Sequence, residues 1–315
     1  MMNLKNMKKS SRDAFVTYGI VVLVYVLIQA LVLTGTMSSL MQGLLVPLCT
    51  YSIVAIGLNL CVGYLGELSL GHAGFMCVGA FSSAFFTKCM EDTAMNPTLR
   101  FILALILGTL MAALFGFLIG VPVLRLRGDY LAIVTLAFGE IIKNVVNVLY
   151  VGRDSKGFHF SMKDTMSLDM ELDGKILING AKGITGIPHQ STFTIGIILL
   201  LLSLIVIYNL VHSRSGRAIM AIRDNRIAAE SVGINVTKFK LLSFTISAAI
   251  AGTGGVLYAY NLSTVTALPA NFGYNMSIMI LVFVVLGGIG NIRGSMIAAV
   301  ILTLLPELLR GLSDY

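Results

Sequence analysis

Charged residues are scarce in this sequence. Asp, Glu, Lys and Arg make up 12% of the 315 residues and apolar residues 57%, whereas soluble domains are about a quarter charged. The four cysteines form no CxxC pair, which argues against a zinc or thiol-exchange site. No GxxxxGK[ST] phosphate loop, HExxH or GxSxG string occurs. The composition is that of an integral membrane protein without the common catalytic signatures.

Apolar runs of about twenty residues, the length that crosses a hydrocarbon layer of about 30 Å, recur along the chain. Seven are clear, at residues 15–33, 40–62, 70–87, 101–121, 130–150, 192–211 and 241–260. An eighth begins near residue 275 and meets the glycine-rich stretch 287–294 before a further apolar piece at 295–305. That stretch predicts either a broken helix with a re-entrant return or two short, tilted spans. We expect one all-α, polytopic domain over residues 1–315, with about eight spans (eight or nine).

Lys and Arg alternate between successive loops, and short cytoplasmic loops retain them. The net charge of +7 therefore follows from membrane topology and does not require a nucleic-acid partner. The uncharged segments 34–39 and 262–273 fall outside, as does the long, charge-balanced loop 151–191; Lys88 and Arg100 are a mild exception there. The N-terminus, the loop after the fourth span and residues 212–240 fall inside, because they carry Lys5, Lys8, Lys9, Arg12, Arg125, Arg127 and six basic residues between 213 and 240.

The segment between the sixth and seventh spans is longer than a helix connection requires. A handful of residues can join two antiparallel helices, whereas about thirty intervene here. Asn225 fits an N-cap and Gly233 a C′ residue, which predicts about two turns of helix over "RIAAESV". A helix this short is marginal by itself, so we expect it to dock on another surface. Ala228 and Ala229 are small enough to let that surface approach the backbone.

Five stretches resemble the permease subunits of branched-chain amino acid ABC importers, in particular the LivM type. They occur in the order "GLNLCVGYLGELSLGHAGFMCVGAF" from Gly57, "RLRGDYLAIVTLAFGEII" from Arg125, "GAKGITGIP" from Gly180, "AIRDNRIAAESVGINVTKFKLLSFTISAAIAGTGGVLYAY" from Ala221 and "LGGIGNIRGSMIAAVIL" from Leu286. Together they span most of the chain. Five strings in a fixed order, at matching topological positions, make the resemblance specific.

The resemblance implies a transport subunit that is not an enzyme. ABC permeases carry Glu-Ala-Ala, three residues and then Gly in the helix that contacts the ATPase. In this chain Ile227 stands at the Glu position and no Leu-Pro pair follows, so the register of that helix is open. By resemblance, coupling to the ATPase falls to Arg226, Ala228, Ala229, Glu230 and Gly233.

The resemblance also implies partners and a location. The partners are a homologous permease subunit, two ATP-binding subunits that hold ATP and Mg²⁺, and an extracytoplasmic binding protein that touches the 151–191 loop. A branched-chain amino acid is the substrate, and the chain itself holds no cofactor or metal. It lies in the bacterial plasma membrane with a cytoplasmic N-terminus. The alternative function is an ion-coupled secondary transporter of amino acids or related solutes, which would need coupling-ion carboxylates; only Glu140 is convincingly intramembrane.

Polar residues inside the fifth span lie on one helix face. Glu140, Lys143, Asn144 and Asn147 follow i, i+3, i+4 and i+7 spacing. One interpretation is a hydrophilic stripe along the translocation pathway. The alternative is an intrahelical pair between Glu140 and Lys143, with both asparagines bonded to neighbouring helices.

Small residues crowd two regions. In the first, close packing is the simpler explanation for Gly57, Gly63, Gly66, Gly71, Gly74 and Gly79. Alternatively, "GYLGELSLGHAGF" interrupts helical order at membrane depth, which would place Glu67 and His72 near the pathway; the default for His72 is a hydrogen-bonded core histidine.

In the second region, the seventh span, spacing does not decide between packing within the chain and a permease dimer for Ala248, Ala251, Gly252, Gly255, Val256 and Ala259.

Overall fold

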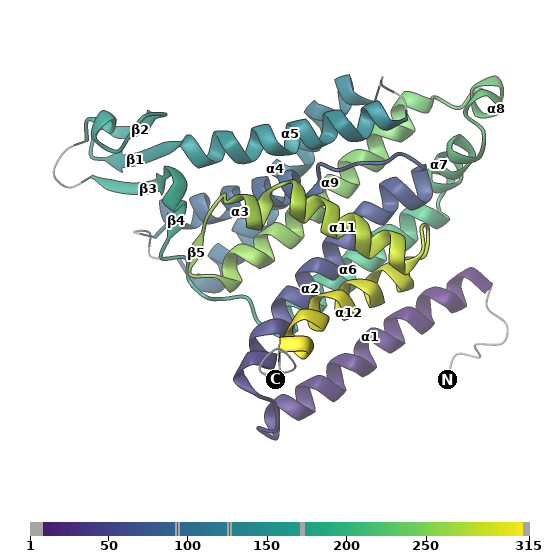
Figure 1. The fold of residues 1–315 in the computed structure, drawn as a ribbon, viewed down its shortest axis with the longest axis horizontal. Helices are drawn as coiled ribbons and strands as arrows, with labels where there is room; N and C mark the ends of the chain where they lie inside the picture. Colours follow the sequence, from purple (N-terminus) through teal and green to yellow (C-terminus); the bar gives the residue numbers. More distant parts are fainter. Residues whose placement is uncertain are drawn as a thin grey trace.

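The computed structural model describes residues 9–91, 93, 95–124, 126, 128–170 and 174–310. These residues form a helical bundle with a small β-structure at one end and helix α8 (Arg226–Ser231) at the other (Figure 1). We call these the sheet end and the α8 end. Four of the basic residues that orient the predicted topology lie outside the described residues: Lys5, Lys8, Arg125 and Arg127.

The longer of the remaining helices follow the predicted runs, and two short ones, at residues 214–224 and 269–272, were not predicted. In the described ranges they are α1 (Lys9–Leu33), α2 (Ser39–Asn59), α3 (His72–Cys89), α4 (Pro97–Val123), α5 (Asp129–Val148), α6 (Phe193–His212), α7 (Arg214–Asp224), α9 (Val236–Asn261), α10 (Pro269–Phe272), α11 (Tyr274–Gly287) and α12 (Ile292–Arg310). A π-helical turn, η2 (Leu60–Leu65), continues α2.

Eight stretches of the described chain are long and apolar enough to cross a membrane, which confirms the polytopic all-α class: Ala14–Leu33, Ser39–Leu65, Pro97–Val123, Tyr130–Val148, Phe193–His212, Val236–Asn261, Pro269–Gly287 and Ile292–Leu309. The third predicted span is not among them; it corresponds to α3, an 18-residue helix whose residues are mostly buried inside the bundle. The count of spans is still eight, because the chain crosses twice around the glycine-rich stretch, at Pro269–Gly287 and Ile292–Leu309. There the chain turns after α11, and α12 packs back against it, so two short helices replace a single broken one.

The loop between α5 and α6 is folded. β1 (Tyr150–Asp154) pairs antiparallel with β2 (Gly157–Ser161) and β3 (Lys175–Asn179), in the order β2-β1-β3. β4 (Ile184–Thr185) pairs with β5 (Thr264–Val265), which ties this loop to the connection after α9. We did not predict these sheets, since strands of two to five residues leave only a weak alternation in the sequence.

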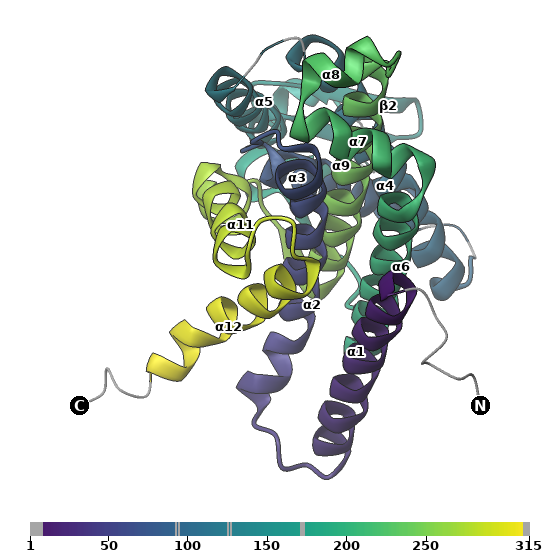
Figure 2. The same cartoon turned by 90° about the vertical axis from the view of Figure 1, so that its right-hand side faces the viewer.

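Helix α9 lies at the centre of the bundle and packs against α2, α3 and α4 (Figure 2). A Cβ atom at Gly252 would meet Ala112 of α4, and one at Gly255 would meet the Met76 carbonyl of α3. The other residues of the two small-residue rows are fully buried: Ala248, Ala251, Val256 and Ala259. Of the two alternatives for this face, packing within the chain or a permease dimer, the structure supports packing within the chain.

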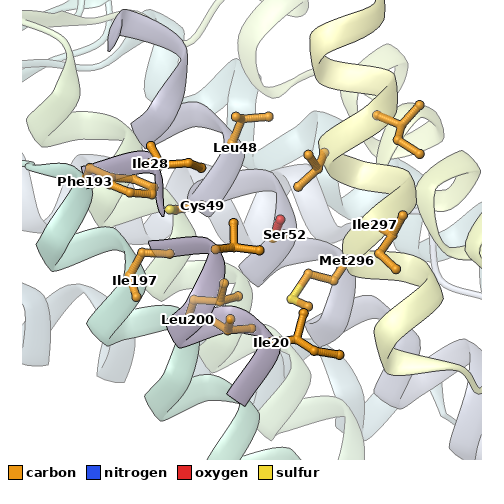
Figure 3. Close-up of a pocket in the computed structure, with 14 residues that line it drawn as sticks. Ile20, Ile28, Leu48, Cys49, Ser52, Phe193, Ile197, Leu200, Met296 and Ile297 are labelled. Carbon is orange, nitrogen blue, oxygen red and sulfur yellow. The ribbon is translucent and has the colours of Figure 1, made fainter. Parts of the chain in front are cut away.

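Helix α1 packs along α6 and leaves an apolar cavity of about 210 Å³ between itself, α2, α6 and α12 (Figure 3). Arg293 Nε donates to Thr17 Oγ1, which fastens the start of α12 to α1. Cys49 and Ser52 are the least apolar of the side chains that line the cavity. A charged or zwitterionic ligand would find almost no polar partner there, so this cavity is not a candidate substrate site.

Substituting Gly252 by valine should destabilise the protein by about 1–3 kcal/mol, since the added side chain forces α9 away from α4. Gly43→Val is the matched control, because a Cβ at Gly43 of α2 meets nothing within 4 Å. Thermal unfolding in detergent can be followed with a thiol-reactive dye, as Cys61 and Cys77 are buried. Equal unfolding temperatures for the two variants would contradict the central packing of α9.

Candidate functional site

Residues 214–231 form two short helices, α7 and α8, at the α8 end. Asn225 Oδ1 accepts a hydrogen bond from the Ala228 backbone N–H at 3.0 Å, and so caps α8 as its side chain predicts. Gly233 follows with φ of +83°, a conformation that glycine adopts without strain. Arg226 pairs with Glu230 at 3.0 Å along the helix. These contacts give a six-residue helix defined ends.

Helix α8 exposes large apolar side chains at both of its ends. Ile227 is 80% exposed and Val232, just after the helix, is 75% exposed. Of the two predicted small residues, Ala228 faces outward and Ala229 is buried against the bundle. Apolar side chains this exposed on a polar turn indicate a contact surface. From the sequence we noted Ile227 only as the residue at the Glu position of the motif and did not predict that Ile227 and Val232 are exposed contact residues, although apolar residues among charged ones could have indicated it.

Helix α7 docks on η2, the π-helical end of α2. Arg223 Nη1 donates to the Gly63 carbonyl at 3.0 Å, and Arg223 also pairs with Asp224 at 2.9 Å. Gly66 has φ of +78°, and a Cβ there would meet Arg223 Cγ, so both backbone and space require glycine. An apolar cluster completes the contact: Leu65, Ile219, Ile222, Ala229 and Val236.

Glu67 lies in the non-helical segment that follows η2. It forms an ion pair with Lys240 of α9, and the two side chains are 16% and 4% exposed. Residues 66–71 are outside any helix, so helical order is interrupted where the glycines predicted it. The glycines also pack closely, since a Cβ at Gly74 would meet Gly139 of α5. Close packing and the interruption of helical order are both present, whereas the position of this segment at membrane depth and the contact of Glu67 with a substrate stay predictions.

His72 begins α3 and is 1% exposed. Its Nε2 lies 2.7 Å from Ser247 Oγ of α9, and its Nδ1 lies 3.4 Å from Ser69 Oγ. The Ser247 hydroxyl donates to the Gly57 carbonyl at 2.5 Å, so the network assigns the imidazole proton to Nε2. These are the surroundings of a hydrogen-bonded core histidine. Its place beside the pathway stays a prediction.

The fifth-span stripe begins with a structural ion pair. Glu140 Oε2 lies 2.5 Å from Lys143 Nζ, and Lys143 is buried. Glu140 Oε1 also accepts the backbone N–H of Tyr274 at 2.6 Å, which holds the first residue of α11 to α5. The intrahelical pair of the structural alternative is therefore present, with an interhelical contact that the sequence did not reveal.

The second half of the stripe is open. Asn144 is exposed on the surface of α5. Asn147 is half-buried, and its Oδ1 is shielded from solvent yet has no hydrogen-bond partner among the described residues. A buried amide oxygen without a donor is costly unless another group supplies one. Asn147 is therefore the stripe residue with capacity left for a ligand or a partner chain.

A family model described as "Branched-chain amino acid transport system / permease component" matches residues 40–315. The chain is 37% identical over 274 residues to the high-affinity branched-chain amino acid transport system permease protein LivM of Salmonella typhimurium and to that of Escherichia coli. Each match covers 84% of this chain and 62% of the relative, so the chain spans less than two thirds of their length. The LivH permease protein of Salmonella typhimurium is 23% identical over 258 residues, 80% of this chain and 79% of LivH. No solved structure matches the chain.

Replacing Glu140 by glutamine should lower the free energy of unfolding by about 3–5 kcal/mol. The amide keeps an acceptor for the Tyr274 N–H but leaves the Lys143 ammonium buried without a counter-charge. The double variant Glu140→Gln/Lys143→Met removes both charges and should recover most of the loss. Thermal unfolding of the three purified proteins measures this. A double variant no more stable than Glu140→Gln would show that the pair does not govern stability.

Proposed function

The chain belongs to the branched-chain amino acid transport system permease family, and from that membership we propose that it is the membrane subunit of an ATP-driven importer. The observation that carries the proposal is α8: a capped helix at one end of the bundle that exposes Ile227, Ala228 and Val232. ATP-binding partner subunits that hold ATP and Mg²⁺ would move this helix, and the attached spans would open alternately to each side. The chain then moves substrate and catalyses no reaction itself.

The distribution of charge supports a cytoplasmic position for α8. Arginines concentrate on α7 and α8, and short loops rich in Lys and Arg stay inside. Helix α1 begins toward the same end of the bundle, while the β-structure lies at the other (Figure 1). We therefore place the N-terminus and α8 in the cytoplasm and the sheet end outside the plasma membrane. The extracytoplasmic binding protein would dock on the sheet end, including residues 180–188.

We place the translocation pathway along α5 and α11. Asn144 is exposed there, Asn147 Oδ1 has no described donor, and Glu140 binds the first residue of α11. A homologous permease subunit would close the other side, and the similarity to both LivM and LivH supports such a pairing. Because Glu67 and His72 are bonded to Lys240 and Ser247, they would hold the broken segment that borders the pathway.

A branched-chain amino acid is the substrate that the names of the LivM and LivH relatives support. The alternative, ion-coupled transport, would need an intramembrane carboxylate that is free to bind and release an ion. Glu140, the strongest candidate from the sequence, is instead bonded to Lys143 and to the Tyr274 N–H. These contacts favour the ATP-driven importer.

Substituting Ala228 by tryptophan should weaken binding of the ATPase subunits about tenfold or more, because the indole keeps α8 from seating in its partner. The fold should persist, since Ala228 is exposed. Leu33→Trp is the control, as Leu33 is 79% exposed at the end of α1 and outside both proposed contact surfaces. Co-purification with the ATPase subunits and leucine uptake into proteoliposomes are measured together. Normal binding and uptake by Ala228→Trp contradicts the coupling role; uptake driven by an ion gradient without ATPases supports the alternative.

Substituting Asn147 by leucine should lower leucine uptake about tenfold while leaving thermal stability unchanged or higher. The reason is that the change removes a buried oxygen with no described donor, a group that is costly in the folded chain. Val148→Leu, at an exposed position on the same helix, is the control. Wild-type uptake combined with a lower unfolding temperature would instead assign Asn147 a structural role.

A further inference from the structure

We propose that Asn59 is a positioning residue that passes the movement of α7 and α8 to the turn between α11 and α12. The proposal rests on the proposed function, because it concerns how ATP-driven movement at the α8 end reaches the pathway. Neither Asn59 nor its partners belong to the predicted coupling or pathway residues.

Asn59 is the last residue of α2 and is fully buried. Its Oδ1 accepts the backbone N–H of Gly290 at 2.9 Å, and its Nδ2 donates to Ser295 Oγ at 2.8 Å. The Ser295 hydroxyl donates to the carbonyl of Asn291, the residue just before α12, at 3.1 Å, which leaves a lone pair for the Asn59 amide. The network thereby fixes the orientation of the amide. One side chain thus holds both the turn after α11 and the first turn of α12.

The backbones meet at the same place. A Cβ at Gly63 of η2 would meet the N and Cα atoms of Gly290, and Gly290 has φ of +82°. A side chain at Gly63 would therefore require Gly290 to move, and the positive φ of Gly290 favours glycine at that position as well. The two glycine-rich stretches, far apart in the sequence, therefore form one junction between α2 and the α11–α12 turn.

The other side of η2 is attached to the coupling helices. Arg223 of α7 donates to the Gly63 carbonyl, and Leu65 packs against Ile219 and Ile222 of α7. A displacement of α7 must therefore carry η2 with it or break these contacts. π-Helical turns in α-helices are frequent at functional sites. Through Asn59, the displaced η2 would pull on Gly290 and Ser295, and so on the end of α11 that lies away from Glu140.

The first test measures coupling in the complete complex with its ATPase subunits, reconstituted in proteoliposomes. Ser295→Ala removes the acceptor for Asn59 Nδ2 and keeps the bond to Gly290. We expect about fivefold or more ATP hydrolysed per leucine transported, the lower range for a coupling between sites, with Ser295→Thr restoring the wild-type ratio. Ser83→Ala is the matched control, because the Ser83 hydroxyl is equally buried but bonds to Ala80 within its own helix. An unchanged ratio in Ser295→Ala overturns the proposal.

The second test separates transmission from a folding defect. Spin labels at Ser231, the exposed last residue of α8, and at Ile289, 60% exposed in the turn, are each paired with a label at Leu110 of α4. The natural cysteines at positions 49, 61 and 77 are buried, and Cys89 is replaced by serine. In the wild-type complex, ATP should shift both distances. In Ser295→Ala, the shift at Ser231 should persist and that at Ile289 should disappear; retention of both shifts overturns the proposal.

If Ser295→Ala does not assemble, Arg223→Ala tests the same route from its other end, with Arg217→Ala on α7 as the control. Loss of the Ile289 shift in Arg223→Ala alone supports the proposal, and its retention overturns it. The failure of the proposed function has a different signature. In that case the wild-type complex itself does not couple ATP hydrolysis to leucine uptake, whatever the variants do.

Discussion

A backbone N–H or C=O group without a partner costs several kcal/mol in hydrocarbon, and this constraint decides how helices can end inside the bundle. Helix α2 loses its regular hydrogen bonding at η2, and α11 ends before the turn at Gly288. The backbone groups left without helical partners at the two breaks form hydrogen bonds with nearby side chains. The Gly63 carbonyl accepts from Arg223, and the Gly290 N–H donates to Asn59. The breaks can therefore exist only where they meet each other and α7.

The same reasoning explains the charged groups of the bundle. Glu67 and Lys240 form one mostly buried pair, and Glu140 and Lys143 form another. Each pair holds separate segments together: the broken segment with α9, and α5 with α11 through the Tyr274 N–H. Both carboxylates are engaged in contacts between segments. On the α5 face, the uncharged Asn144 is exposed and Asn147 Oδ1 has no hydrogen-bond partner among the described residues. A neutral polar lining of the proposed pathway would suit a zwitterionic substrate that carries no net charge.

These contacts connect α8, the proposed contact site of the ATPase subunits, with the turn between α11 and α12. Helix α8 is held to α7, α7 to η2, and η2 to the α11–α12 turn, each by contacts between named side chains and backbone atoms. Helix α9, which starts directly after α8, runs through the centre of the bundle and packs closely on α2, α3 and α4. Interiors packed this tightly transmit displacement instead of absorbing it. In the proposed mechanism, a movement of α8 would therefore reach α11 and α12 through these contacts.

The sequence by itself determined the membrane class, the bounds of most helices, the caps of α8 and the interruption near Gly66, because hydrophobic length, capping side chains and glycine act over a few neighbouring residues. It did not determine which partner each polar group takes. Only the tertiary structure decided that Glu67 pairs with Lys240, that His72 bonds to Ser247, and that α3 is buried among the other helices of the bundle. It also decided that Asn59 joins breaks 231 residues apart in the chain. Such contacts depend on how distant helices pack, and residue spacing along one helix does not identify the residues of other helices that it contacts.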